Sequence, residues 1–317
     1  MKSRKLSPAT LKLSILATLA LGGCLTTTLP AYRAEVAQRI AAPAWMLKRQ
    51  VPAAPFALTV FERIHKRGGV ANVYIAGDGD VWTSPREWKD NPTPQNPVGL
   101  HLASKDDAQN VIYIARPCQY SGMMDRAEDC PPALWHEARY GQQVINSVNA
   151  ALDEMALRYD LRGFNLIGYA GGGTVASLLA TRRTDILSLR TVAGVMDHKA
   201  QSAALQAPVL TQSLNPVDEA DKLSHVPQYH FIGGQDKYVP PAVLHSYLQA
   251  LPPTRCVQYD MIQEAGYEDG WVDKWPELLK RPVNCKNSEN NLDDIDLLSE
   301  PVKKEPLYPI PEKPAKP

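Results

Sequence analysis

Short apolar runs alternate with amphipathic stretches over most of the 317-residue chain. Apolar residues at spacings of three and four predict helices, and brief continuous apolar runs predict buried strands. Strands separated by helices are typical of a mostly parallel sheet that is covered on both faces. The predicted strands cover residues 56–61, 70–75, 110–115, 163–168, 188–195, 228–232 and 255–262, and the predicted helices cover residues 135–159, 174–182, 240–251 and 272–279.

The first 23 residues have the pattern of an exported protein's leader. A basic segment precedes a nine-residue apolar run at residues 13–21, which is too short to span a bilayer. Leu21-Gly22-Gly23-Cys24 then resembles a bacterial lipobox, in which the cysteine is diacylated and becomes the new N-terminus. Leu25, rather than an aspartate, follows Cys24, and this favours the outer membrane of a Gram-negative bacterium, facing the periplasm. An ordinary signal peptide with a chance cysteine is the alternative.

The remaining chain divides into three parts by composition. Residues 24–55 are rich in alanine and proline, carry one short helical stretch at 32–41, and predict a lipid-anchored tether. Residues 56–285 hold the alternating strands and helices and predict one domain. Residues 286–317 are acidic and then proline-rich, so they cannot bury enough apolar surface to fold alone. They predict a disordered tail, or alternatively a spacer or docking peptide.

Charge and cysteine content fit this division. The chain has 34 basic and 34 acidic residues. The leader holds four of the basic residues and no acidic one, so its removal leaves 30 basic and 34 acidic residues. Such a balance does not indicate nucleic-acid binding. With Cys24 lipidated, four cysteines remain, which allow three connectivities. Proximity in sequence favours the pairs Cys118–Cys130 and Cys256–Cys285 in an oxidising compartment. The spacings do not suit zinc, and neither a metal nor a cofactor is predicted.

The candidate chemistry centres on a glycine-rich turn. Gly168-Tyr-Ala170-Gly171-Gly-Gly173 follows a predicted strand and precedes a predicted helix, which is the context of a nucleophile elbow. Its centre is Ala170, whose methyl group cannot attack a carbonyl. A phosphate-binding loop is the alternative, although the glycines are out of register and the Lys-Ser/Thr pair of such loops is absent.

The other expected parts of a hydrolase site are incomplete. Asp236 follows a predicted strand, where a triad acid would lie, although a turn or helix-capping aspartate is the alternative. A catalytic histidine would follow the next strand, but residues 263–271 contain none. Gly77 could let a backbone N–H approach a bound oxygen, together with the N–H of Gly171, as in an oxyanion hole.

These motifs together resemble the α/β-hydrolase superfamily, and specifically bacterial periplasmic lipoproteins with a G-Y-S-G-G-G elbow. The resemblance covers about residues 35–285 and implies an α/β-hydrolase fold. In those relatives serine stands at the position of Ala170, aspartate at that of Asp236, and histidine at that of Tyr267, four residues before Trp271. The motifs that carry the resemblance are Gly77-Asp-Gly79, Ala115-Arg-Pro-Cys-Gln-Tyr120, Gly168 to Gly173, Ser213-Leu-Asn-Pro216 and His230 to Pro241.

Two of the three implied triad positions therefore depart from the family pattern. Loss of the nucleophile or base alone costs about 10⁶-fold in a comparable triad. The sequence thus predicts a non-catalytic binding or accessory protein, with the membrane and an envelope protein or small ligand as partners. The alternatives are an esterase- or peptidase-like hydrolase with an unorthodox site, and a structural envelope protein that docks a partner through its proline-rich tail.

Overall fold

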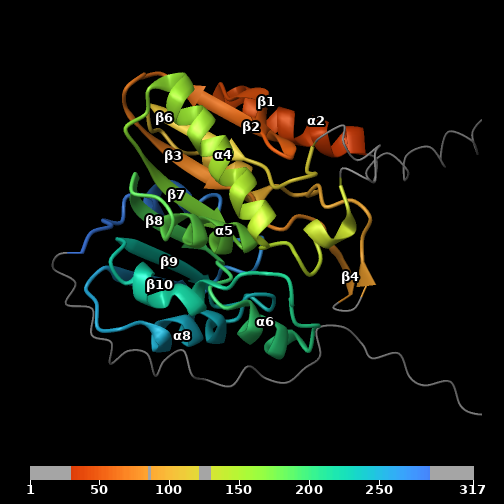
Figure 1. Ribbon diagram of the computed structural model, residues 1–317, viewed down its shortest axis with the longest axis vertical. Coiled ribbons are helices and arrows are strands. Elements are labelled where there is room, and N and C mark those ends of the chain that lie inside the picture. The colour runs from red at the N-terminus through yellow and green to blue at the C-terminus, as the bar shows by residue number, and fades with distance from the viewer. Residues whose placement is uncertain (1–29, 85–86, 121–129, 286–317) are drawn as a thin grey trace, which may run out of the picture.

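The computed structural model describes residues 30–84, 87–120 and 130–285 (Figure 1). The predicted leader, the lipobox Cys24 and the predicted tail lie outside the described residues, so those predictions stay untested. The described chain forms one large sheet with helices on both faces, and a small ribbon of β4 (Trp82–Ser84) and β5 (Glu87–Trp88) beside it.

The large sheet has eight strands in the order β1-β2-β6-β3-β7-β8-β9-β10. The pairs β1–β2 and β2–β6 are antiparallel, and every later pair is parallel. The predicted fold class, a mostly parallel sheet, is confirmed. The strands are β1 (Leu47–Ala53), β2 (Phe56–Ile64), β3 (Val70–Ile75), β6 (Asn110–Ile114), β7 (Gly163–Tyr169), β8 (Ile186–Val192), β9 (Gln228–Gly233) and β10 (Val257–Ile262).

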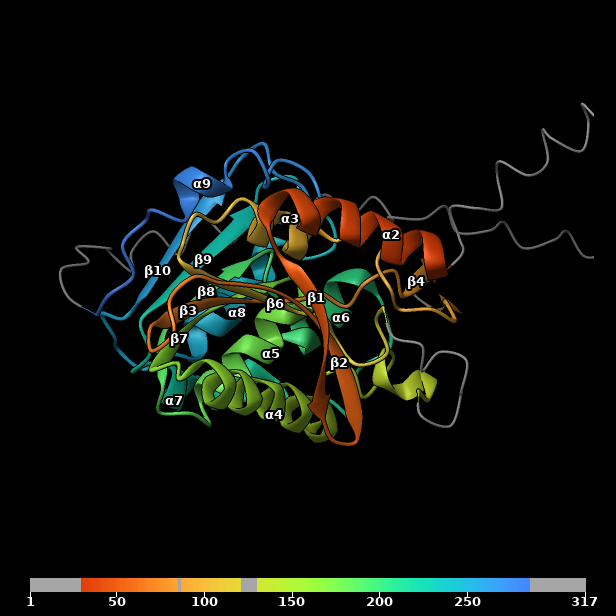
Figure 2. The same ribbon diagram turned by 90° about the horizontal axis from the view of Figure 1, so that it is seen from above.

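Two apolar cores cover the two faces of this sheet (Figure 2). One face packs against α4 (Gln142–Tyr159), α5 (Gly171–Ala180), α7 (Ala220–Leu223) and α8 (Pro241–Ala250). The other packs against α2 (Pro30–Ala41), α3 (Val98–Ser104) and α9 (Trp275–Leu278). Helix α6 (His198–Leu205) follows β8, and short 3₁₀ turns lie at Ala42–Ala44, Pro132–Leu134 and Pro216–Glu219.

The folded region begins earlier than the predicted boundary at residue 56. Residues 30–53, assigned above to the tether, form α2 and the edge strand β1. Ala37, Ala41 and Met46 are buried, so this segment is part of the core. Periodicity misses β1 because an edge strand buries few positions: only Val51 and Ala53 of its seven residues are buried.

Both predicted disulfides are present. Cys118–Cys130 joins Cα atoms 5.8 Å apart, and Cys256–Cys285 joins Cα atoms 3.8 Å apart. The second bond ties the residue that precedes β10 to the last described residue of the chain. Because ligands of parallel sheets bind outside the carboxyl ends of the strands, the loops after β3, β7, β9 and β10 are where a site is expected.

Candidate functional site

The turn between β7 and α5 has the backbone of a nucleophile elbow. Ala170 has φ 49° and ψ −122°, a region that L-residues with a side chain rarely adopt. Three hydrogen bonds hold this conformation: Ala170 N–H donates to Val192 O (2.9 Å), while Gly173 N–H (2.9 Å) and Val195 N–H (3.2 Å) donate to Ala170 O. The strained backbone conformation is therefore held by main-chain hydrogen bonds, around a residue whose side chain is a methyl group.

Glycines flanking the turn allow α5 to approach the sheet closely. A Cβ added at Gly172 would lie 2.1 Å from the carbonyl oxygen of Ile75, and one at Gly168 would lie 2.4 Å from that of Gly172. Neither backbone atom can move aside as a flexible side chain could. The glycines are thus required by packing, independently of any reaction at residue 170.

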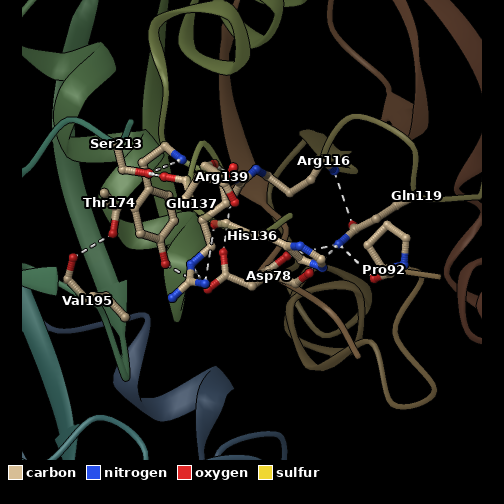
Figure 3. Close-up of polar contacts among 12 residues, drawn as sticks. Asp78, Pro92, Arg116, Gln119, His136, Glu137, Arg139, Thr174, Val195 and Ser213 are labelled. Carbon is tan, nitrogen blue, oxygen red and sulfur yellow. Dashed lines mark hydrogen bonds and ion pairs between the residues drawn. The ribbon is translucent and has the colours of Figure 1, made fainter. Parts of the chain in front are cut away.

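A buried ionic cluster lies over the start of α5 (Figure 3). The Asp78 carboxylate accepts a hydrogen bond from Tyr140 Oη (2.7 Å) and forms ion pairs with Arg116 (3.3 Å) and Arg139 (3.6 Å). A Cβ at Gly171 would lie 2.1 Å from Asp78 Oδ1 and 2.5 Å from Tyr140 Oη, so these two groups cover the first turn of the helix. Burial, and then the negative charge of Asp78, raise the pKa of Tyr140, which keeps its phenol protonated.

The loop that carries Asp78 is held by the segment around Cys118. The Gln119 side-chain amide donates to the carbonyl oxygens of Gly77 (3.1 Å), Asp78 (3.2 Å) and Pro92 (3.3 Å). Gly79 has φ 84°, and a Cβ there would lie 1.8 Å from Pro92 O, so only glycine fits. Gly77 therefore has a fixed position two residues after the end of β3. Because β3 pairs with β7, this position is on the same side of the sheet edge as the turn that carries Gly171.

The predicted acid position lies after β9, in a nearly closed environment. Asp236 is 5% exposed. Its Oδ1 accepts hydrogen bonds from the N–H groups of Tyr238 and Val239, both at 2.8 Å, while its Oδ2 has no hydrogen-bond partner among the described residues. Burial raises the pKa of Asp236 to about 7, against the opposing effect of the two N–H donors.

Tyr267 lies after β10, among aromatic rings. Its ring centroid is 5.6 Å from that of Tyr169 and 5.0 Å from that of Tyr238, and its carbonyl oxygen accepts hydrogen bonds from Tyr169 Oη (2.9 Å) and Trp271 Nε1 (3.1 Å). Burial raises the pKa of Tyr267, followed by the negative charges of Asp78 and Asp236. Tyr267 therefore lies near enough to Asp78 and Asp236 for both charges to act on its phenol.

Two cavities, of about 560 and 360 Å³, open at this edge of the sheet. Tyr267 and Glu268 line both cavities and therefore stand between them. Asp78, Arg139 and Tyr238 line the larger one, and Tyr113 and Tyr169 line the smaller. Ala170, at 0% exposure, lines neither of these two cavities.

His198 lies beside this cluster. It is 1% exposed, its ring centroid lies 6.1 Å from that of Tyr140, and burial, then the charge of Arg139, lower its pKa. No hydrogen bond connects its ring with Asp236 or Tyr267. Within the described ranges no group of three or more His, Cys, Asp or Glu side chains could hold a metal ion, and no helix is both long and apolar enough to cross a membrane.

Arg139 and Tyr140 were missed by the sequence reasoning. The predicted helix 135–159 includes both, whereas α4 begins at Gln142 and leaves them in the preceding turn. Arg116 belongs to the motif Ala115 to Tyr120, but the motif alone assigns no role to its side chain. The sequence could not show the role of Arg139 and Tyr140, because their partner Asp78 lies about 60 residues away along the chain.

The fold is shared with solved serine hydrolases, at low sequence identity. An α/β serine hydrolase homologue from Coxiella burnetii matches with TM-score 0.50 and 12% identity over 74% of this chain and 95% of that one. An esterase from Pyrococcus furiosus matches with TM-score 0.52 and 12% identity, over 75% and 90%. An acylaminoacyl peptidase from Pyrococcus horikoshii matches with TM-score 0.52 and 13% identity, over 80% and 44%. No protein-family model and no curated protein sequence matches this chain. These structures show that the chain has the predicted α/β-hydrolase fold.

Proposed function

We propose that this protein is a non-catalytic binding or accessory protein built on the α/β-hydrolase fold. One observation carries the proposal: the elbow holds Ala170, which is fully buried and lines neither cavity. A methyl group has no lone pair to attack an acyl carbon. The strained turn keeps its conformation because glycine packing and three backbone hydrogen bonds fix it.

The position of the catalytic base supports the same proposal. A triad works because an imidazole accepts the nucleophile's proton while a carboxylate orients the ring. Tyr267, whose pKa is raised, keeps its own proton at neutral pH and cannot accept another. Asp236 accepts only backbone N–H groups through Oδ1, so it supports the loop after β9 and orients no imidazole.

The cavities supply a place to bind. Their volumes, about 360 and 560 Å³, fall within the range of small-molecule sites, and their walls combine tyrosine rings with carboxylate, guanidinium and amide groups. Such walls suit a polar ligand or an inserted partner segment. Binding there does not require the missing hydroxyl of a serine at residue 170.

The protein is proposed to act at the periplasmic side of an outer membrane, anchored by acyl chains on Cys24. Two disulfides within one chain fit an oxidising compartment. Fractionation of cells that produce wild-type chain and Cys24→Ala tests the anchor. Wild type should sediment with outer membranes and Cys24→Ala should not carry the acyl chains; unchanged acyl labelling of the variant would contradict the proposal.

Catalysis is tested with the purified full chain, a panel of ester, amide and thioester substrates, and a fluorophosphonate probe. Wild type should show neither turnover above the uncatalysed rate nor labelling, whereas Ala170→Ser/Tyr267→His restores both reactive groups and is the positive comparison. Ala170→Ser alone controls for a serine without a base. Turnover by wild type that is lost in Asp236→Asn would favour the competing hydrolase and end the non-catalytic proposal.

A further inference from the structure

Trp45 ends the 3₁₀ turn Ala42–Ala44 that follows α2, at a position where glycine is usual. Met46 N–H donates to Ala41 O (3.1 Å) and Trp45 N–H donates to Ala42 O (3.0 Å), the hydrogen-bond pair of a Schellman motif. Trp45 occupies the left-handed position of that motif, at φ 58° and ψ 25°. Glycine dominates this position because any Cβ is strained there. The buried Met46 supplies the apolar contact of the motif, so the cap itself does not need the indole.

Trp45 and its neighbours form an exposed apolar and basic corner. Trp45 is 80% exposed and Leu47, the first residue of the edge strand β1, is 73% exposed. Lys48, the next residue of β1, is also exposed, and its side chain points to the opposite face of the strand from that of Leu47. Arg39, in the last turn of α2, has a side chain that is 72% exposed and pairs with the exposed Glu35. We name these residues the α2–β1 corner: Arg39, Trp45, Leu47 and Lys48.

The composition of this corner matches a phospholipid surface. Tryptophan is enriched at the headgroup level of membranes, where its apolar ring and its N–H are both satisfied. Lysine and arginine side chains are attracted to anionic headgroups, and Lys48 and Arg39 supply two positive charges here against the one negative charge of Glu35. In water alone, the strained backbone of Trp45 and the exposed apolar side chains of Trp45 and Leu47 are all unfavourable, and burial against the described residues compensates for little of this.

The corner also lies within reach of the proposed anchor. Five residues lie between Cys24 and Pro30, the first residue of α2, and the six steps from Cα to Cα can span about 20 Å when extended. The 12 residues of α2 add about 18 Å along the side of the sheet that carries β1 (Figure 1). A membrane that holds Cys24 can therefore also meet Trp45.

We infer that the α2–β1 corner is a second membrane contact, in which Trp45 and Leu47 enter the headgroup region of a bilayer containing anionic phospholipid. Lys48 and Arg39 then lie near lipid phosphates. The inference rests on the proposed anchor at Cys24. Acyl chains alone leave the domain free to rotate, and the corner would fix which side faces the lipid.

The test uses the full acylated chain reconstituted into vesicles of phosphatidylethanolamine and phosphatidylglycerol with brominated acyl chains, which quench nearby indoles. Wild type should lose about a sixth of its fluorescence, because one of six tryptophans contacts lipid. Trp45→Phe should abolish this quenching. Leu47→Glu should reduce it at least twofold, whereas Val209→Glu, at a 57% exposed valine after α6, should not change it.

The outcomes separate the corner from the anchor. A chain that does not float with vesicles overturns the anchor and the inference with it. A chain that floats but is not quenched, or is quenched equally in Trp45→Phe, overturns the corner alone. If wild type is not quenched and instead forms a dimer that dissociates in Trp45→Gly, the corner binds a second copy of the chain, and the lipid contact is overturned. Trp45→Gly should unfold at the same or a higher denaturant concentration; a lower midpoint would mean that the indole serves the fold and would overturn the inference.

Discussion

The turn between β7 and α5 and the loops after β9 and β10 lie at the same edge of the sheet, yet different interactions determine their structures. The turn keeps its backbone almost independently of its central side chain, because Gly168 and Gly172 lie against main-chain atoms. The loops keep Asp236 but present a tyrosine where the base is expected. Packing against main-chain atoms therefore fixes the backbone of the turn whatever side chain stands at residue 170, whereas the loops after β9 and β10 owe their chemistry to the side chains they carry.

The largest effect on stability should come from the glycines of the turn between β7 and α5. Gly172→Ala places a methyl group 2.1 Å from Ile75 O, and we expect a loss of at least about 3 kcal/mol in the free energy of unfolding, measured by urea denaturation. Gly266→Ala is the matched control, since its Cβ would meet nothing nearer than 3.9 Å. Equal stability of the two variants would show that α5 can move away from β3.

The ionic cluster over α5 should come next. Asp78→Asn leaves the buried Arg116 and Arg139 without a carboxylate, and we expect a loss of about 3 kcal/mol in the free energy of unfolding. Asp218→Asn, which breaks the exposed pair with Lys199, should cost less than about 0.5 kcal/mol. A neutral Asp78→Asn would indicate that packing of the two guanidinium groups on the Tyr140 ring is sufficient compensation.

The buried carboxyl group of Asp236 should make the free energy of unfolding depend on pH. The pKa of Asp236 is raised to about 7 in the folded state, from 3.8 when exposed, so between these values the folded protein binds a proton that the unfolded chain has released. This group therefore stabilises the fold increasingly as pH falls from 7 to 5, by up to about 1.4 kcal/mol per pH unit. Histidines with lowered pKa values act in the opposite direction, so the contribution is measured as wild type minus Asp236→Asn. A difference that is flat with pH would contradict the buried, protonated carboxyl group.

The smallest effect concerns strain at the elbow itself. Ala170→Gly should raise the free energy of unfolding by about 0.5–1 kcal/mol, because glycine adopts φ 49° without strain. Ala176→Gly, in the middle of α5, should lower it by about 1 kcal/mol or more. Calorimetry of both variants checks the contrast. Destabilisation by Ala170→Gly would mean that packing of the buried methyl group outweighs the strain of the turn.

The sequence predicts the sheet, its mostly parallel order and the elbow, because these depend on apolar runs and on glycines at fixed positions. The strands that precede Ala170 and Asp236 are mainly apolar and fully or almost fully buried, and glycines lie at or just before their ends. The edge strand β1 escapes prediction because four of its seven residues are exposed. Disulfide pairing could be predicted from proximity alone, since only three connectivities were possible.

The candidate site could be predicted only in part. The positions of Ala170 and Asp236 are predictable because each follows a predicted strand, and parallel strands place their ends at one edge. The position of Tyr267 is assigned through the family resemblance, four residues before Trp271. Arg139 and Tyr140 are not predictable, because their role depends on Asp78, which is distant in sequence. The burial that raises the pKa of Asp236 likewise arises from packing among loops. A linear pattern carries no information on that packing.

The bond between Cys256 and Cys285 gives the domain a particular response to mechanical load. A pull on the chain beyond residue 285 would enter the sheet through the sulfur–sulfur bond, beside the start of β10. The 29-residue separation between the two cysteines, about 100 Å of extended chain, would then carry no tension. Under reducing conditions the same pull would act first on the segment that holds Tyr267. The disulfide thus determines whether a force applied beyond residue 285 reaches the loop of Tyr267, which lines both cavities.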